Sequence, residues 1–180
     1  MSGVLVAIII ALIVVLIVAY ALRTARRRKH LQDRFGPEYA RTVEARDSRL
    51  AAERDLSRRE ARHAKLDIKP LPAEVRERYA QDWSRVQQRF VDSPEHSVEE
   101  ADRLVTALMR ERGYPTEGYE QQVRDLSVEH GRTLEHYRAA HEVNVRRGRG
   151  EATTEELRGA LVHYRALFGD LLQDESTHAR

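Results

Sequence analysis

VLVAIIIALIVVLIVAYAL, from Val4 to Leu22, is the stretch that decides the fold, since every residue in it is apolar or tyrosine. Its nineteen residues, at about 1.5 Å each, form a helix of roughly 28 Å, close to the ~30 Å hydrocarbon core of a bilayer. In lipid the backbone must satisfy its own hydrogen bonds, so even this run rich in Val and Ile is expected to be helical. Tyr20 lies near the end, where an interfacial aromatic is expected. We therefore predict a transmembrane anchor over residues 1–22.

A cleaved secretory signal is the alternative interpretation of the same stretch. Such a signal starts with a charged region and ends at a small-residue cleavage site. Residues 1–3 carry no basic side chain, and the one small-x-small candidate, residues 19–21, runs directly into arginines. The apolar run is also longer than that of a usual signal. These features favour an uncleaved signal-anchor.

A basic flank follows the anchor, in a juxtamembrane segment over residues 23–36. Five basic residues occur within seven positions, namely Arg23, Arg26, Arg27, Arg28 and Lys29, whereas no Lys or Arg precedes the anchor. An excess of Lys and Arg marks the cytoplasmic side of a membrane helix, so we predict the N-terminus outside and the C-terminal domain in the cytoplasm. The flank is also expected to attract anionic lipid head groups, by on the order of 1 kcal/mol per basic residue.

The charge balance of the remainder argues against nucleic acid as a partner. The chain has 31 Lys+Arg and 29 Asp+Glu, and without the five flanking residues 26 remain against 29, a net charge of −3. The high isoelectric point is therefore mostly a property of the flank. The absence of cysteine excludes disulfides and thiolate chemistry, and it fits a cytoplasmic domain without excluding an outer one.

Residues 37–69 are predicted to form a charged helical stalk. Phe35-Gly36-Pro37 interrupts the anchor helix, and Pro37 is suited to the first position of the next one. Charged residues and alanine then alternate, which gives a solvated helix of roughly 40 Å if it is continuous. One strand of a weak coiled coil is the alternative. The apolar stripe of this segment is faint and consists of Tyr39, Val43, Leu50 and Leu56.

Residues 70–173 are predicted to form a bundle of about five short helices, which makes the chain all-α, with residues 174–180 as a loose tail. Pro70 and Pro72 mark the boundary with the stalk. Apolar residues then recur at helical spacing, and no segment alternates with the period of a strand. The apolar faces are Val75, Tyr79, Trp83, Val86 and Phe90; Val98, Ala101, Leu104, Val105, Leu108 and Met109; Tyr119, Val123 and Leu126; Leu134, Tyr137 and His141; and Leu157, Leu161, Tyr164, Phe168 and Leu171.

Helix ends in the bundle carry their own signals. Ser93 is a predicted N-cap before Pro94, with a capping box at residues 97–100 as the alternative, and Thr116 is a predicted N-cap of a short helix. Gly113 is expected just after a helix end. Thr153-x-x-Glu156 predicts a capping box for the last helix.

The sequence contains no motif from which we would assign a catalytic, cofactor-binding or metal site. Two Glu-x-x-His pairs, Glu60/His63 and Glu175/His178, have the spacing of di-iron bundles but fall in the stalk and the tail, where inward-facing carboxylates are not expected. His141 is the best candidate for acid–base work, although a hydrogen-bonded, partly buried histidine is the simpler interpretation.

Two further patterns have simple structural interpretations. Arg146, Arg147 and Arg149 read as a flexible solvated loop, with phosphate or lipid contact as the alternative. The motif around Tyr137 recurs 27 residues later around Tyr164, and we expect both tyrosines to pack in similar core surroundings.

Three stretches resemble a group of uncharacterised actinobacterial proteins, which are single-span membrane or secreted helical proteins. The stretches are YAQDWSRVQQRFVDSP, ADRLVTALMRERGYP and GEATTEELRGALVHYRALFGDLL, and the resemblance covers most of the chain after the anchor. It implies no known activity and no catalytic residues, and its secreted members point to the opposite topology from the flanking charges.

The sequence thus predicts a membrane-anchored, non-enzymatic helical tether whose domain faces the cytoplasm and binds a protein partner that the sequence does not identify. An anchored or secreted domain outside the cytoplasm and an enzyme centred on His141 are the alternatives.

Overall fold

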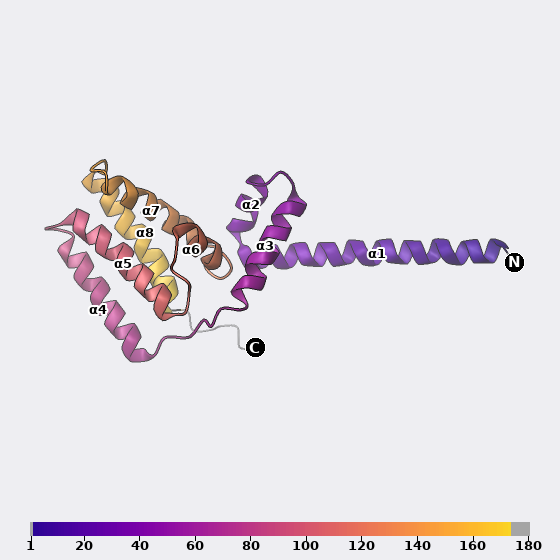
Figure 1. Cartoon of the computed structure of the whole chain (residues 1–180), viewed down its shortest axis with the longest axis horizontal. Helices are drawn as coiled ribbons and strands as arrows, with labels where there is room; N and C mark the ends of the chain where they lie inside the picture. Colours follow the sequence, from indigo (N-terminus) through magenta and orange to yellow (C-terminus); the bar gives the residue numbers. More distant parts are fainter. Residues whose placement is uncertain (1, 174–180) are drawn as a thin grey trace. The chain divides into compact units, whose positions relative to one another are not determined.

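The computed structural model describes residues 2–173, which form eight helices and no strand, so the predicted all-α class is confirmed. The chain divides into two compact units, Met1–Ser57 and Arg58–Arg180. The helices, labelled in Figure 1, are α1 (Ser2–Phe35), α2 (Pro37–Glu44), α3 (Arg49–His63), α4 (Ala73–Arg89), α5 (Pro94–Glu111), α6 (Tyr119–Leu126), α7 (Leu134–Arg147) and α8 (Thr154–Gln173).

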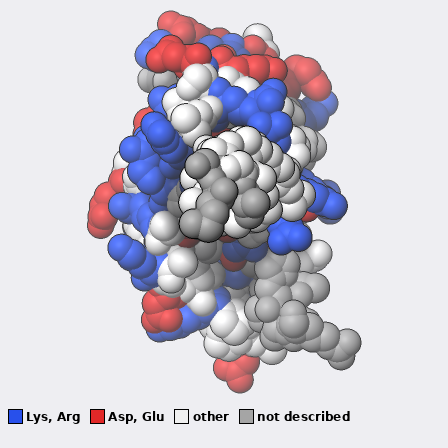
Figure 2. All heavy atoms as spheres, turned by 90° about the vertical axis from the view of Figure 1, so that its right-hand side faces the viewer, with Lys and Arg blue, Asp and Glu red and all other residues white. Residues whose placement is uncertain are grey.

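The N-terminal part of α1 is apolar on every side, and its described side chains are exposed. Its large hydrophobic side chains between Leu5 and Leu22 are 50–71 % exposed. The helix is long and apolar enough to cross a membrane: Leu5–Phe35 contains a window of mean hydropathy 3.4 in which no residue is buried. Figure 2 looks onto this end of the helix, where the described residues are neither acidic nor basic. A helix that is apolar all round requires an apolar environment.

The first unit has a small core beyond the apolar part of α1. Leu31 and Phe35 of α1 are 1 % and 0 % exposed, and Tyr39 of α2 and Leu56 of α3 are buried with them. Gly36, with φ at +52°, ends α1, and Pro37 begins α2 as predicted. A residue with a side chain is strained at such a φ, whereas glycine is not.

The segment predicted as a stalk is not one continuous helix. α2 ends at Glu44, and α3 begins only at Arg49. The Ser48 hydroxyl accepts a hydrogen bond from the Ala51 amide at 3.2 Å, so it caps α3 instead of continuing α2. Leu56, expected on a solvated helix, is fully buried. The boundary of the compact units falls after Ser57, inside α3.

The second unit contains the five-helix bundle, α4 to α8. In Figure 1, α8 runs between α5 and α7, and α4 lies along the outer side of α5. Trp83 of α4 stacks on Phe168 of α8 with ring centroids 4.6 Å apart. All five residues predicted for the inner face of the last helix are buried: Leu157, Leu161, Tyr164, Phe168 and Leu171.

Two predicted helix ends are confirmed in atomic detail. The Glu156 amide donates to the Thr153 hydroxyl at 3.3 Å, while the Thr153 amide donates to the Glu156 carboxylate at 2.8 Å, which is the reciprocal capping box. After α5, Gly113 has φ at +96°, and the amides of Gly113 and Tyr114 return to the carbonyls of Arg110 and Met109. This is a Schellman motif.

Two other caps differ from the prediction. Ser93 occupies the N-cap position of α5, but its side chain makes no capping hydrogen bond. The N-cap of α6 is Gly118 and not Thr116, whose hydroxyl accepts hydrogen bonds from the Arg110 guanidinium. The positive φ of Gly118, +80°, explains why the chain enters α6 there.

The two copies of the repeated motif, on α7 and α8, contact each other. Tyr137 of α7 and Tyr164 of α8 are both buried and meet edge to face at 6.3 Å. One position before each tyrosine, His136 and His163 also meet, with their Nδ1 atoms 2.9 Å apart. Tyr137 and Tyr164 are thus core residues, and they contact each other.

Candidate functional site

The five residues of the basic flank all lie on α1, and two of them are held by α3. The Arg27 guanidinium donates to the Ser57 hydroxyl at 2.8 Å, and the Arg28 Nε lies 3.3 Å from the Glu53 carboxylate. The Tyr39 hydroxyl donates to the same carboxylate at 2.9 Å. Part of the predicted membrane flank therefore fastens α2 and α3 to α1.

His141 lies in a ring stack and not in an acid–base pair. Its imidazole stacks on Tyr119 with centroids 3.7 Å apart, and its buried Nδ1 has no hydrogen-bond partner within residues 2–173. Burial lowers the pKa of His141, against the opposing influence of Asp102 and Glu120. A neutral, half-buried imidazole is consistent with a packing role, with its pKa shifted mainly by desolvation.

The Glu60/His63 pair does not form a recognisable metal site. In the part of the chain that the structure describes, no three His, Cys, Asp or Glu side chains converge as metal ligands would. Glu175 and His178 lie outside the described residues. His63 is buried, and it belongs to a different polar cluster.

Two arginines in the last turn of α7 are engaged with acidic neighbours. Arg146 donates to Glu156 at 2.6 Å, and Arg147 lies 3.6 Å from Glu99. Hydrogen bonds from the Thr153 backbone and from Arg146 lower the pKa of Glu156 to about 2, so this carboxylate stays ionised. Arg146 and Arg147 thus belong to the last turn of α7 and its ion pairs instead of a free loop.

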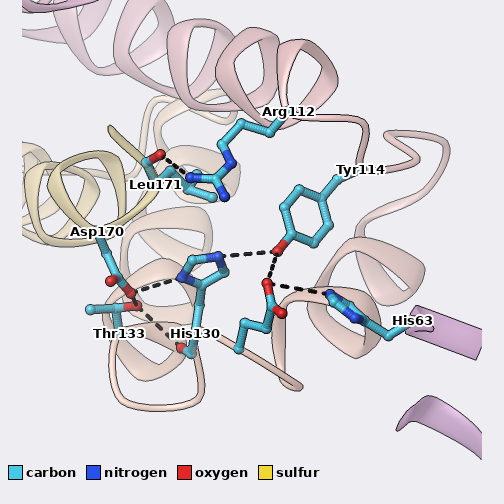
Figure 3. A network of polar contacts seen from close by, with 8 residues as sticks. His63, Arg112, Tyr114, His130, Thr133, Asp170 and Leu171 are labelled. Carbon is cyan, nitrogen blue, oxygen red and sulfur yellow. Dashed lines mark hydrogen bonds and ion pairs between the residues drawn. The ribbon is translucent and has the colours of Figure 1, made fainter. Parts of the chain in front are cut away.

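The most elaborate polar arrangement of the second unit is a network centred on His130 (Figure 3). The His130 Nδ1 lies 3.0 Å from the Asp170 carboxylate, and its Nε2 lies 3.2 Å from the Tyr114 hydroxyl. Tyr114 also donates to Glu129 at 3.1 Å, and the His63 Nε2 lies 3.6 Å from that carboxylate. We call these five residues the His130 network.

The network joins four separate segments of the second unit. His63 ends α3, Tyr114 follows α5, His130 lies between α6 and α7, and Asp170 is on α8. Arg112 adds a further link, since its guanidinium donates to the Leu171 carbonyl near the end of α8 at 2.8 Å. Side-chain bonds therefore hold together loops that carry few apolar residues of their own.

Electrostatics keep the acidic end of the network ionised. Burial alone would raise the pKa of Asp170, but hydrogen bonds from His130 and Thr133, with the charge of Arg112 nearby, outweigh it and lower that pKa. The Thr133 hydroxyl donates to Asp170 at 2.6 Å. The carboxylate is therefore an acceptor that fixes the His130 ring through Nδ1–H.

The Tyr114 hydroxyl has one hydrogen but two neighbours that could accept it, Glu129 and His130. When that hydrogen points to Glu129, the phenol oxygen can only accept from His130, which then carries protons on both nitrogens. When His130 is neutral with its proton on Nδ1, its Nε2 competes with Glu129 for the same phenolic hydrogen. The Tyr114 hydroxyl can therefore donate to only one of its two neighbours at a time.

An aspartate–histidine–hydroxyl chain is also the geometry of hydrolytic triads. Here the hydroxyl belongs to Tyr114, which is 2 % exposed, and His130 is equally buried. A reacting group has to meet a substrate, whereas these atoms contact only protein. The His130 network therefore fits a role in holding the bundle together.

Sequence reasoning did not find the network, because its members lie far apart in the chain. His130 and Asp170 are separated by 40 positions, and His130-Gly131 reads as a break between helices. The one available signal was the pair of titratable residues Glu129 and His130 in a short linker, which alone does not indicate a partner.

Comparison of the chain with protein-family models, with curated proteins and with solved structures found no match. Function is therefore argued from the chain itself.

Proposed function

We propose that the protein is a single-pass, membrane-anchored tether whose helical bundle faces the cytoplasm and binds a protein partner without catalysing a reaction. The observation that carries the proposal is α1, whose large side chains between Leu5 and Leu22 are at least 50 % exposed. Burial of such side chains is worth roughly 1.5–3 kcal/mol each, so a helix left in water would forgo a large free energy that a bilayer supplies.

The cytoplasmic orientation is supported by the unequal number of basic residues on the two sides of the apolar helix. The five basic residues stand on its C-terminal side, and residues 1–22 contain no Lys or Arg. Positive charge is retained in the cytoplasm during insertion. The binding role is supported by the form of the second unit, which is a helical bundle whose most elaborate polar cluster has its tyrosine and both histidines buried.

Two fractionation experiments test the anchor. The full chain is expected to remain in the membrane pellet after alkaline carbonate extraction, whereas a variant lacking residues 4–22 should move to the supernatant. Release of the full chain would contradict an integral anchor. A mature N-terminus beyond Ala21 would instead support cleavage and an extracytoplasmic domain.

A reporter fused after Arg180 tests the orientation. Alkaline phosphatase folds into an active enzyme only outside the cytoplasm, so the fusion is expected to be inactive, while a fluorescent protein at the same position should fluoresce. An active phosphatase fusion would contradict the proposed orientation and place the C-terminal domain outside the cytoplasm. Crosslinking in intact cells followed by mass spectrometry would then identify the partner.

A further inference from the structure

The five basic residues that follow the apolar part of α1 differ in whether they contact α3. Successive residues are rotated by about 100°, which places Arg27 and Arg28 on the side of the buried Leu31 and Phe35. These two arginines contact Ser57 and Glu53 of α3. Both arginine side chains therefore have partners within the first unit.

The other three basic residues form a row centred on Arg26, with Arg23 one helical turn before Arg27. Arg23, Arg26 and Lys29 follow one another at intervals of three residues, and the middle of the row lies roughly opposite Leu31 and Phe35. All three are exposed, and none forms a hydrogen bond or ion pair with another residue in the range 2–173. We call these three residues the basic row.

The depth of the basic row matches that of lipid head groups. It starts one residue after Leu22, so at about 1.5 Å per residue it extends from about 1.5 to about 10 Å beyond the apolar stretch. The head-group layer on each side of the hydrocarbon core is roughly 5–7 Å thick. Long basic side chains near a helix end also reach toward this layer.

We propose that the basic row is a binding site for the phosphate groups of anionic phospholipids, while Arg27 and Arg28 are reserved for holding α3. The guanidinium groups of Arg23 and Arg26 have the planar, two-pronged geometry that suits phosphate oxygens. The inference rests on the proposed membrane anchor, because only a helix in a bilayer places the row among head groups. It holds for either orientation of the chain.

The chain offers a matched pair of variants to test the site. R23Q/R26Q and R27Q/R28Q each remove two arginine charges from neighbouring positions of the same helix. The full-length proteins are reconstituted in phosphatidylcholine vesicles that contain a trace of spin-labelled phosphatidylglycerol or spin-labelled phosphatidylcholine. The fraction of motionally restricted label gives the relative association constant of the anionic lipid.

We expect R23Q/R26Q to lower this constant by up to about 5-fold for each lost charge, the fold-change that corresponds to about 1 kcal/mol per basic residue at anionic lipid. R27Q/R28Q should change it by less than about 2-fold, and 0.5 M salt should weaken the preference of the wild-type protein. An equal decrease of the association constant in both variants, or no decrease in R23Q/R26Q, would contradict the proposed site. Flotation of the vesicles separates this failure from failure of the anchor, since a chain that does not float was never inserted.

Discussion

Replacing Gly113 with alanine should destabilise the bundle strongly, because two separate penalties meet at this position. The backbone φ is +96°, which a side chain disfavours by about 1–2 kcal/mol. A Cβ atom built there would lie 2.2 Å from the carbonyl oxygen of Asp67. Removing such an overlap requires a backbone shift, which costs about 1–3 kcal/mol.

Gly118 provides the control, since it has a similar φ of +80° but nothing within 4 Å of its Cβ position. G118A should therefore show the conformational penalty alone, reduced by roughly 0.4–1 kcal/mol because alanine restricts the unfolded chain. We expect a loss of about 2–4 kcal/mol in the free energy of unfolding for G113A and of about 1 kcal/mol or less for G118A.

Urea denaturation of the full-length protein in non-ionic detergent, followed by circular dichroism, measures both values. Ellipticity reports the helices of the bundle, whose unfolding transition should shift to lower urea in G113A. If the two variants lose the same stability, the close approach between Asp67 and the end of α5 does not exist in solution. The linker between α3 and α4 would then not be fastened where its backbone hydrogen bond, Lys69 to Arg112 at 2.9 Å, places it.

Three further predictions concern single side chains. D170N should cost about 1 kcal/mol, since the carboxylate is 38 % exposed and its charged hydrogen bonds are partly screened. Because the folded pKa of Asp170 is lowered, its contribution is present above about pH 3.9 and is lost as the pH falls through the folded pKa, so acid titrations of D170N should be flatter than those of the wild type. T153A should lower stability by about 1 kcal/mol through loss of the α8 cap, whereas T154A, one position later, should not. Burial and the neighbouring His136 lower the pKa of His163, so its contribution to stability is lost as the pH falls from about 6.5 through its folded pKa. H163Q should therefore lose less stability over this range than the wild type, and identical pH profiles of the two proteins would contradict the paired histidines.

The bundle was largely predictable because its signals are local. Thr153 and Glu156 are three residues apart, Gly113 stands beside the helix it ends, and the apolar faces repeat every three to four residues. Each of these patterns fixes structure within one or two helical turns. The five short helices and their inner faces could therefore be identified before any coordinates.

The first unit and the His130 network depend on contacts between distant segments. The core of the first unit takes only one or two apolar residues from each of three helices, for example Leu31 and Leu56, so no single helix shows a strong stripe. The ring partners of His130 are Tyr114, which follows α5, and Asp170 on α8, and polar residues alone carry no periodic signal. Such contacts follow from topology and not from local pattern.

The topology of α1 is the central claim, and the cysteine-free chain allows a direct measurement of it. Single cysteines are introduced as Gly3→Cys, before the apolar stretch, and Arg149→Cys, in the exposed loop between α7 and α8. Intact cells are treated with a membrane-impermeant maleimide, and lysed cells show that both sites react once the membrane is open. If the C-terminal domain faces the cytoplasm, only the cysteine at position 3 is labelled in intact cells. Labelling at position 149 with protection at position 3 would contradict this orientation.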